Sequence, residues 1–154
     1  MSKLIIILFA ALACAPSATQ AQNEKLIGMT QISRNDGLLT FVLMGSFANR
    51  DECAKEINTF TESFITAARQ TGREATANFA VCDTHAPPGR EFEALRKGTP
   101  TSHYLFFTPS IRMMIVHKRG TTEYERQMCE FWRGQFLSKL NIKAKCYSPN
   151  IRQP

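Results

Sequence analysis

ATANFAVC, residues 75–82, is an apolar segment that we predict to form a β-strand ending at Cys82. The preceding segment, residues 49–72, is predicted to form a helix with Cys53 in its first turns. Such a helix runs about 28 Å from Cys53 to its end, and the strand returns about 23 Å. If the strand before the helix and the strand after it run in the same direction, both cysteines lie at the same end of the unit. This geometry predicts a Cys53–Cys82 disulfide.

The helix has clear sequence signals at both ends. Asn49 is a favourable N-cap, and Glu52 follows at the spacing of a capping box. Gly72 is a typical residue for the end of a helix. The side chains that recur at helical spacing are apolar and predict a buried face. They are Cys53, Ile57, Phe60, Phe64, Ile65 and Ala68.

The direction of the side chains on the strand leaves one point open. Phe79 and Val81 point to one face of a strand, whereas Ala80 and Cys82 point to the other. The disulfide therefore requires that the Ala80 face packs against the helix, or that both faces of the sheet are covered.

The rest of the chain predicts two hairpins and a second long helix. Asp36 and Gly37 form the turn of the first hairpin. We expect an α+β fold, with a mostly antiparallel five-stranded sheet and two main helices in the order ββα-β-ββα. One parallel pairing is expected between the strands on either side of the first helix. The further strands are predicted at residues 26–33, 38–44, 103–107 and 111–118, and a short helix of one or two turns at 91–97.

The last helix is predicted to begin at Thr121 or Thr122 and to end near Asn141. Thr122 and Glu125 have the spacing of a capping box. A tail follows from about residue 142. The six residues that lead to Cys146 are able to fold back along the helix when extended. A second disulfide is therefore predicted between Cys129 and Cys146.

The N-terminal segment predicts export. Residues 1–21 combine Lys3, a ten-residue apolar run and small residues near a cleavage site, as in a secretory signal peptide. Lipidation at Cys14 is the minor alternative. Either outcome gives a periplasmic or secreted protein, and residues 22–154 form a single predicted domain without a transmembrane segment. The remaining four cysteines, an even number, favour two disulfides in such a compartment.

The net charge of +6 is concentrated in the last third of the chain. Residues 112–154 contain nine Lys or Arg against three Glu, whereas residues 22–111 contain nine against ten Asp or Glu. We expect this end to attract an anionic envelope polymer, a membrane surface or an acidic protein. Nucleic acid is not an expected partner outside the cytoplasm. The predicted anion-binding patch consists of Arg126, Arg133, Lys139, Lys143 and Lys145.

No catalytic motif is present, and we assign no catalytic residue, metal or cofactor. Cys82 and His85 have the spacing of a metal half-site, but a second ligand pair is missing. The sequence therefore predicts a small exported, disulfide-stabilised binding or accessory protein. The alternative is a periplasmic or secreted hydrolase whose site lies near the loop from Asp83 to Glu93, where Glu91 adds a further carboxylate.

Overall fold

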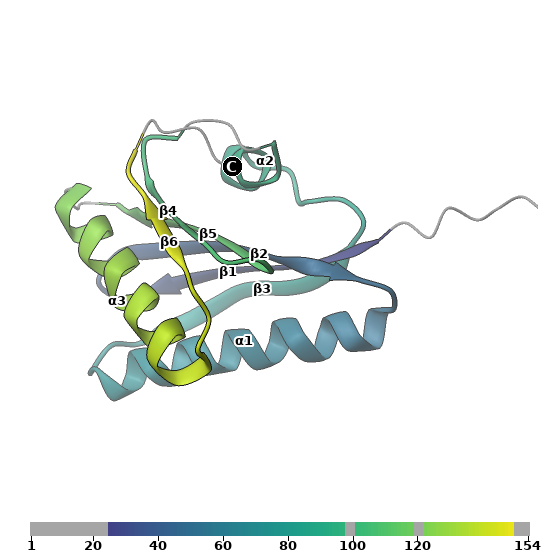
Figure 1. Ribbon diagram of the computed structural model, residues 1–154, viewed down its shortest axis with the longest axis horizontal. Helices are drawn as coiled ribbons and strands as arrows, with labels where there is room; N and C mark the ends of the chain where they lie inside the picture. The colour runs from purple at the N-terminus through teal and green to yellow at the C-terminus, as the bar shows by residue number, and fades with distance from the viewer. Residues whose placement is uncertain (1–24, 98–100, 119–121, 150–154) are drawn as a thin grey trace, which may run out of the picture.

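The computed structural model describes residues 25–97, 101–118 and 122–149. The predicted signal peptide at residues 1–21 and the alternative lipidation site Cys14 lie outside these ranges. The described chain forms six strands and three helices (Figure 1). They are β1 (Leu26–Arg34), β2 (Leu38–Phe47), α1 (Arg50–Gln70), β3 (Ala75–Asp83), α2 (Arg90–Lys97), β4 (Tyr104–Phe107), β5 (Ile111–His117), α3 (Thr122–Leu140) and β6 (Lys145–Tyr147).

The strands form one antiparallel sheet in the order β3-β1-β2-β5-β4-β6. The α+β class was predicted correctly, but the sheet has six strands and not five. The third helix, α2, lies where a short helix of one or two turns was predicted at residues 91–97. The additional strand, β6, lies in the predicted tail and pairs with β4. Its three residues include a lysine, and so short a polar segment gives no strand signal of its own.

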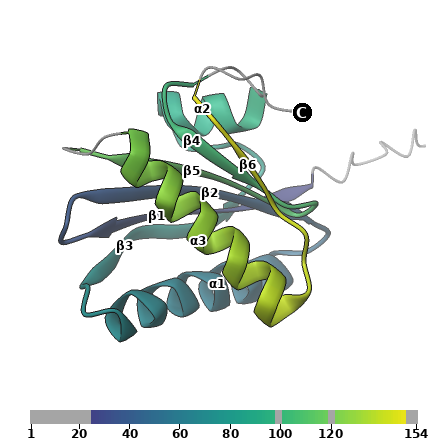
Figure 2. The ribbon, with the colours of Figure 1, turned by 60° about the vertical axis from the view of Figure 1, so that its left-hand side comes forward.

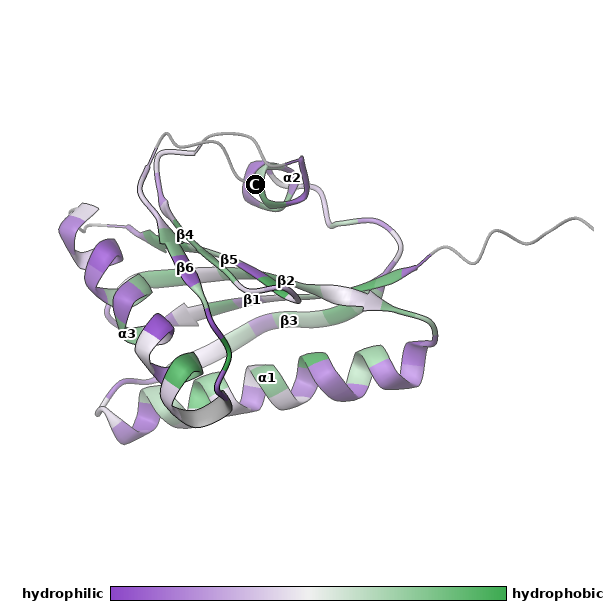
Figure 3. Ribbon diagram, in the orientation of Figure 1, coloured by the Kyte–Doolittle hydropathy of each residue, from purple (hydrophilic) through white to green (hydrophobic). Residues whose placement is uncertain are grey.

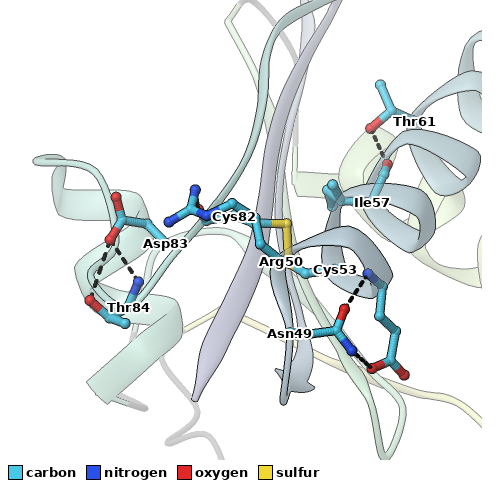
Figure 4. The surroundings of a disulfide bond; sticks show 9 residues. Asn49, Arg50, Cys53, Ile57, Thr61, Cys82, Asp83 and Thr84 are labelled. Atoms are coloured by element: carbon cyan, nitrogen blue, oxygen red, sulfur yellow. Dashed lines mark hydrogen bonds between the residues drawn. A yellow bond between two sulfur atoms is a disulfide. The ribbon is translucent and has the colours of Figure 1, made fainter. Parts of the chain in front are cut away.

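The expected parallel pairing of β2 with β3 is wrong. Strand β3 pairs with β1, which separates it from β2. Because β2 and β3 are each antiparallel to β1, they nevertheless run in the same direction. The predicted Cys53–Cys82 disulfide requires only this common direction, and it is present, with Cα atoms 6.0 Å apart (Figure 4).

The two faces of the sheet are covered by different helices. Helices α1 and α3 pack on one face and α2 packs on the other (Figures 1 and 2). Ala80 and Cys82 face α1, where they pack with Cys53 and Ile57. Phe79 points to the opposite face and meets the ring of Phe92 in α2, with centroids 5.6 Å apart. Both faces are therefore covered, and the Ala80 face is the one that packs against α1.

Helix α1 follows its sequence signals closely. Asn49 Oδ1 accepts a hydrogen bond from the backbone N–H of Glu52 at 2.8 Å, which confirms the N-cap. Gly72 follows the helix with φ +70°, a conformation that glycine adopts readily. The apolar side of the helix faces the sheet and the polar side faces solvent (Figure 3). The buried side chains are Cys53, Ile57, Thr61, Phe64 and Ala68.

The first half of helix α3 is attached to the sheet at two points. Glu125, predicted as part of a capping box, is 4% exposed and points to β4 and β5 instead. Its carboxylate accepts hydrogen bonds from the backbone N–H groups of His117 and Tyr104 and lies 3.0 Å from His103 Nδ1. One turn further along α3, the predicted disulfide between Cys129 and Cys146 ties the helix to β6. None of the helices in the described ranges has an apolar stretch long enough to cross a membrane.

Candidate functional site

A cleft of about 1030 Å³ lies at one corner of the sheet. Its walls come from the end of β2, the first turns of α1, the β4–β5 turn, the end of α2 and the tail that follows α3. Apolar side chains from both faces of the sheet line it together with charged side chains. The apolar lining residues are Ile27, Leu43, Met44, Phe47, Phe107, Pro109, Ile111 and Tyr147.

A β-bulge shapes the edge of the cleft. Gly28 pairs with Met44 and Leu26 with Phe47, so Gly45 and the residue after it stand opposite a single residue of β1. Gly45 has φ +49°, and its N–H donates a hydrogen bond to the carbonyl of Ser110 in the β4–β5 turn. The bulge therefore bends the end of β2 and joins it to the turn that forms the opposite edge.

Three neighbouring strands place one cation on each side of an aromatic ring. Phe107 of β4 pairs with Arg112 of β5 on one side and with Lys145 of β6 on the other. Directly paired residues point to the same face, so the three side chains form a row across the sheet, with their backbones about 10 Å apart from end to end. The Arg112 guanidinium lies 5.8 Å from the centroid of the Phe107 ring, in cation–π contact.

The end of α2 positions Arg112 and adds another cation. Arg112 Nη1 donates a hydrogen bond of 3.0 Å to the carbonyl of Leu95 and a longer one, 3.5 Å, to that of Arg96. These carbonyls belong to the last turn of the helix, where the dipole favours positive charge. Arg96 itself is exposed and lines the cleft. The guanidinium of Arg112 is thus fixed beside a second arginine.

The cations of the cleft lack acidic partners within the described part of the chain. Arg96, Arg112, Lys143 and Lys145 line it, and none of the ion pairs among the described residues includes them. The acidic lining residues are Glu52 and Glu56, both on α1. Arg96 and Arg112 make the cleft basic beside α2, and Glu52 and Glu56 make it acidic beside α1. Lys143, in the tail after α3, adds a cation whose chain neighbours Ile142 and Ala144 pack on the α1–α3 face.

Only part of the predicted anion-binding patch lines the cleft. Lys143 and Lys145 line the cleft, but Arg126 and Arg133 lie on α3 and do not. The side chain of Lys139 is outside the described part of the structure. The five residues of the predicted patch did not include Arg96 or Arg112. Arg112 belongs to the basic last third, whereas Arg96 comes from the charge-balanced part, so charge counting gave no signal for it.

The two arginines on α3 are paired within their own helix. Arg126 donates hydrogen bonds of 2.7 and 2.6 Å to the carboxylate of Glu123, and Arg133 Nε donates one of 2.6 Å to Glu130. The Arg126 guanidinium, followed by the amide of Gln127, lowers the pKa of Glu123 to about 2. Both pairs are exposed at i, i+3 spacing, so these cations are already neutralised by helical neighbours.

The loop that follows Cys82 is not part of the cleft. Asp83 Oδ1 accepts hydrogen bonds from the backbone N–H groups of His85 and Thr84, and these bonds hold the pKa of that carboxyl below its usual range. Glu93 is paired with Lys97 in α2. Asp83 and Glu93, two of the carboxylates considered for the hydrolase alternative, are thus engaged locally. Among the described residues, no cluster of three His, Cys, Asp or Glu side chains is arranged to hold a metal ion.

Comparison of the chain with protein-family models, with curated proteins and with solved structures gave no match. The functional conclusion therefore depends on the cleft alone.

Proposed function

We propose that the protein is a small exported binding protein that holds an anionic ligand at the basic end of the cleft. One observation carries this proposal, namely the row formed by Arg112, Phe107 and Lys145. Arg96 and Lys143 add positive charge to the same cleft. The two disulfides are consistent with an exported protein.

The charge distribution supports an anion as the ligand. Arg112 and Lys145 stand on either side of an aromatic ring with no carboxylate between them, and like charges at this spacing repel each other. An anion held between the two cationic groups relieves this repulsion and gains charge-assisted hydrogen bonds from both side chains. The apolar lining residues beside the row, such as Leu43 and Phe107, lower the local dielectric and strengthen these interactions. Candidate sources of the anion are an envelope polymer, a membrane surface and an acidic protein.

Calorimetric titration with inorganic pyrophosphate tests the proposal. We compare the wild type with Arg112→Gln/Lys145→Gln and with Arg126→Gln/Arg133→Gln, which removes the same number of positive charges from α3. Binding is expected to weaken at least about tenfold in the first variant and less than about twofold in the second, because only the first pair lies in the cleft. Binding of the wild type is also expected to weaken with added salt.

Equal weakening in the two variants would mean that net charge, and not the cleft, attracts the anion. Absence of pyrophosphate binding in the wild type would also contradict the proposal. Because Arg112 contacts the end of α2, thermal melts are used to check that the variant is folded. The single variant Lys145→Gln, at an exposed position, provides a second measurement that does not disturb this contact.

A further inference from the structure

We infer that the outer edge of β6 is a docking site for an extended acidic segment of a partner protein, which adds to the sheet as a further antiparallel strand. Strand β6 is the last strand on its side of the sheet, and β4 pairs with only one of its two edges. The inference goes beyond the proposed function, with which it shares Lys145. It follows from three features: the direction of the backbone groups at this edge, the spacing of its lysines, and the contrast with the opposite edge of the sheet.

The β4–β5 hairpin fixes the direction of the backbone groups of β6. The N–H of Thr108 donates a hydrogen bond of 2.9 Å to the carbonyl of Ile111, so these two residues form a hydrogen-bonded pair. Hydrogen-bonded and non-hydrogen-bonded pairs alternate along an antiparallel ladder, so the backbone groups of Phe107 point away from β5 and towards Lys145. Those of Cys146, the next residue of β6, therefore point away from β4. Among the described residues, none forms a hydrogen bond with them.

The segment that leads into β6 continues this edge and carries its lysines on one side. Ile142, Ala144 and Cys146 all pack against the core beneath α1 and α3. The residues between them, Lys143 and Lys145, point to the other side and line the cleft. Two residues of an extended chain span about 6.6 Å, in this segment and in any strand paired with it. A partner strand with an acidic residue at every second position therefore places one carboxylate opposite each lysine.

The pairing geometry favours a carboxylate opposite Lys145. Because the backbone groups of Lys145 point to β4, a residue opposite it on an added strand stands in a non-hydrogen-bonded pair, in which the two side chains are closest. Lys143 and Lys145 are exposed and take part in none of the ion pairs among the described residues. Opposite charges across strands stabilise the pairing, and no existing ion pair has to break.

The two edges of the sheet differ in what they admit. At the β3 edge, Arg50 donates a hydrogen bond to the Cys82 carbonyl, and the ladder shifts at Asn78. Both features hinder the addition of a strand. At the β6 edge, Lys143 and Lys145 oppose pairing with a second copy, because its lysines carry the same charge. An acidic strand meets no such repulsion, so this edge selects an acidic partner and disfavours a second copy.

The test titrates the oxidised protein with a short acidic peptide and follows the backbone amides by NMR. The probe, acetyl-Glu-Thr-Glu-Thr-Glu-Thr-Glu-amide, has a carboxylate at every second residue. Its isomer, acetyl-Glu-Glu-Thr-Thr-Thr-Glu-Glu-amide, has no two carboxylates at that spacing. Because the edge is short, we expect a dissociation constant of roughly 1 mM for the probe and at least about threefold weaker binding of the isomer. The amide proton of Cys146 should shift downfield as it donates to the peptide.

Variants assign the binding to the lysines of the edge. Lys143→Gln/Lys145→Gln is expected to weaken peptide binding at least about fivefold, and the matched variant Arg126→Gln/Arg133→Gln less than about twofold. Arg112→Gln should weaken pyrophosphate binding but change peptide binding less than about twofold, because β5 is separated from β6 by β4. Thermal melts check folding. The single variant Lys143→Gln, at a residue that precedes β6, is measured as well.

Methylated peptides separate backbone pairing from charge. With glutamates opposite the lysines, the threonines stand opposite Cys146 and Ala144, so the threonine N–H groups face β6 and the glutamate N–H groups face solvent. N-methylation of the three threonines is expected to weaken binding at least about fivefold. N-methylation of three of the glutamates leaves the hydrogen bonds to β6 intact, and we expect a change of less than about twofold.

The outcomes separate this inference from the proposed function. If pyrophosphate binds and the peptide does not at about 10 mM, the edge site is excluded while the anion site stands. Binding of the peptide alone would contradict the proposed function and leave the edge site. Equal binding of the two isomers, or equal loss with methylated threonines and glutamates, would show that charge alone attracts the peptide and would overturn the inference. A loss with Arg112→Gln as large as with the double lysine variant would place the peptide on the row in the cleft, and would also overturn it.

Discussion

The Cα atoms of Cys53 and Cys82 lie 6.0 Å apart, so one covalent bond joins the start of α1 to the end of β3. The same end of the molecule contains a second tie, because Arg50 Nη1 donates a hydrogen bond of 2.9 Å to the Cys82 carbonyl (Figure 4). The start of α1 is therefore anchored to the sheet by a disulfide whose two cysteines are both buried.

Removing each disulfide is expected to lower the free energy of unfolding by a different amount. The Cys53–Cys82 bond spans 29 residues and the Cys129–Cys146 bond spans 17. Loop entropy predicts losses of about 3.5 kcal/mol for Cys53→Ala/Cys82→Ala and about 3 kcal/mol for Cys129→Ala/Cys146→Ala. Urea denaturation of the two variants measures the difference. A loss below about 1 kcal/mol for either pair would contradict this account.

Asp36 is expected to make stability depend on pH. Arg34 donates hydrogen bonds to Asp36 and is the main cause that holds the pKa of this carboxyl well below its usual range; Tyr124 also donates to it. A lowered pKa in the folded state stabilises the protein at pH values above the unfolded pKa of about 3.9. This contribution is lost as pH falls through the folded pKa.

The substitution Asp36→Asn tests this dependence. It is expected to lower the free energy of unfolding by about 3 kcal/mol at pH 7, because the 8%-exposed side chain of Arg34 loses its carboxylate. The difference from the wild type should decrease below about pH 4, where the wild type also begins to lose the interaction. Glu62→Gln, on the exposed side of α1, is the control and should show no such trend. A difference that stays constant from pH 7 to pH 2 would exclude this explanation.

Glu125 is expected to be essential for attaching α3 to the sheet. The variant Glu125→Ala leaves the partly buried N–H groups of Tyr104 and His117 without this acceptor, and we expect a loss of about 2–3 kcal/mol. Glu125→Gln retains one acceptor oxygen, so its loss should be smaller. Urea denaturation gives both values. Equal losses for the two variants would show that packing, and not hydrogen bonding, is responsible.

Two glycines are expected to respond in opposite directions to substitution by alanine. Gly134 lies inside α3, and a Cβ atom at this position meets nothing within 4 Å. Gly134→Ala should therefore raise the free energy of unfolding by about 0.5–1 kcal/mol. Gly37 has φ +91° in the β1–β2 turn, so Gly37→Ala should lower it by about 1–2 kcal/mol. Thermal melts compare the two, and destabilisation by Gly134→Ala would indicate a contact on the outer side of α3.

Features that depend on local sequence could be predicted, and those that depend on tertiary pairing could not. The Asn49 cap and the Gly37 turn follow from neighbouring residues, and both disulfides follow from the lengths of the elements between them. The order of strands does not follow, since β3 beside β1 and β3 beside β2 satisfy the same hydrophobic pattern. The alternation of side chains between the two faces of β3 is also interrupted, because the pairing of β1 with β3 shifts at Asn78.

The cleft could be predicted only in part. Lys143 and Lys145 were found from charge composition, which cannot show that Arg126 and Arg133 are paired with glutamates one turn away in the folded helix. The row across Phe107 requires knowledge of β6, a strand that becomes recognisable only when its pairing with β4 is seen.

Strand β6 also links the cleft to the redox state of the chain. It has three residues, and Cys146 lies between Lys145 and Tyr147, both of which line the cleft. So short a strand has few hydrogen bonds to hold it, and its covalent bond to Cys129 adds to the ring contact between Tyr147 and Phe107. Oxidation of the chain therefore fixes one wall of the cleft. In a molecule whose thiols remain reduced, that wall is held only by a short ladder and by side-chain packing.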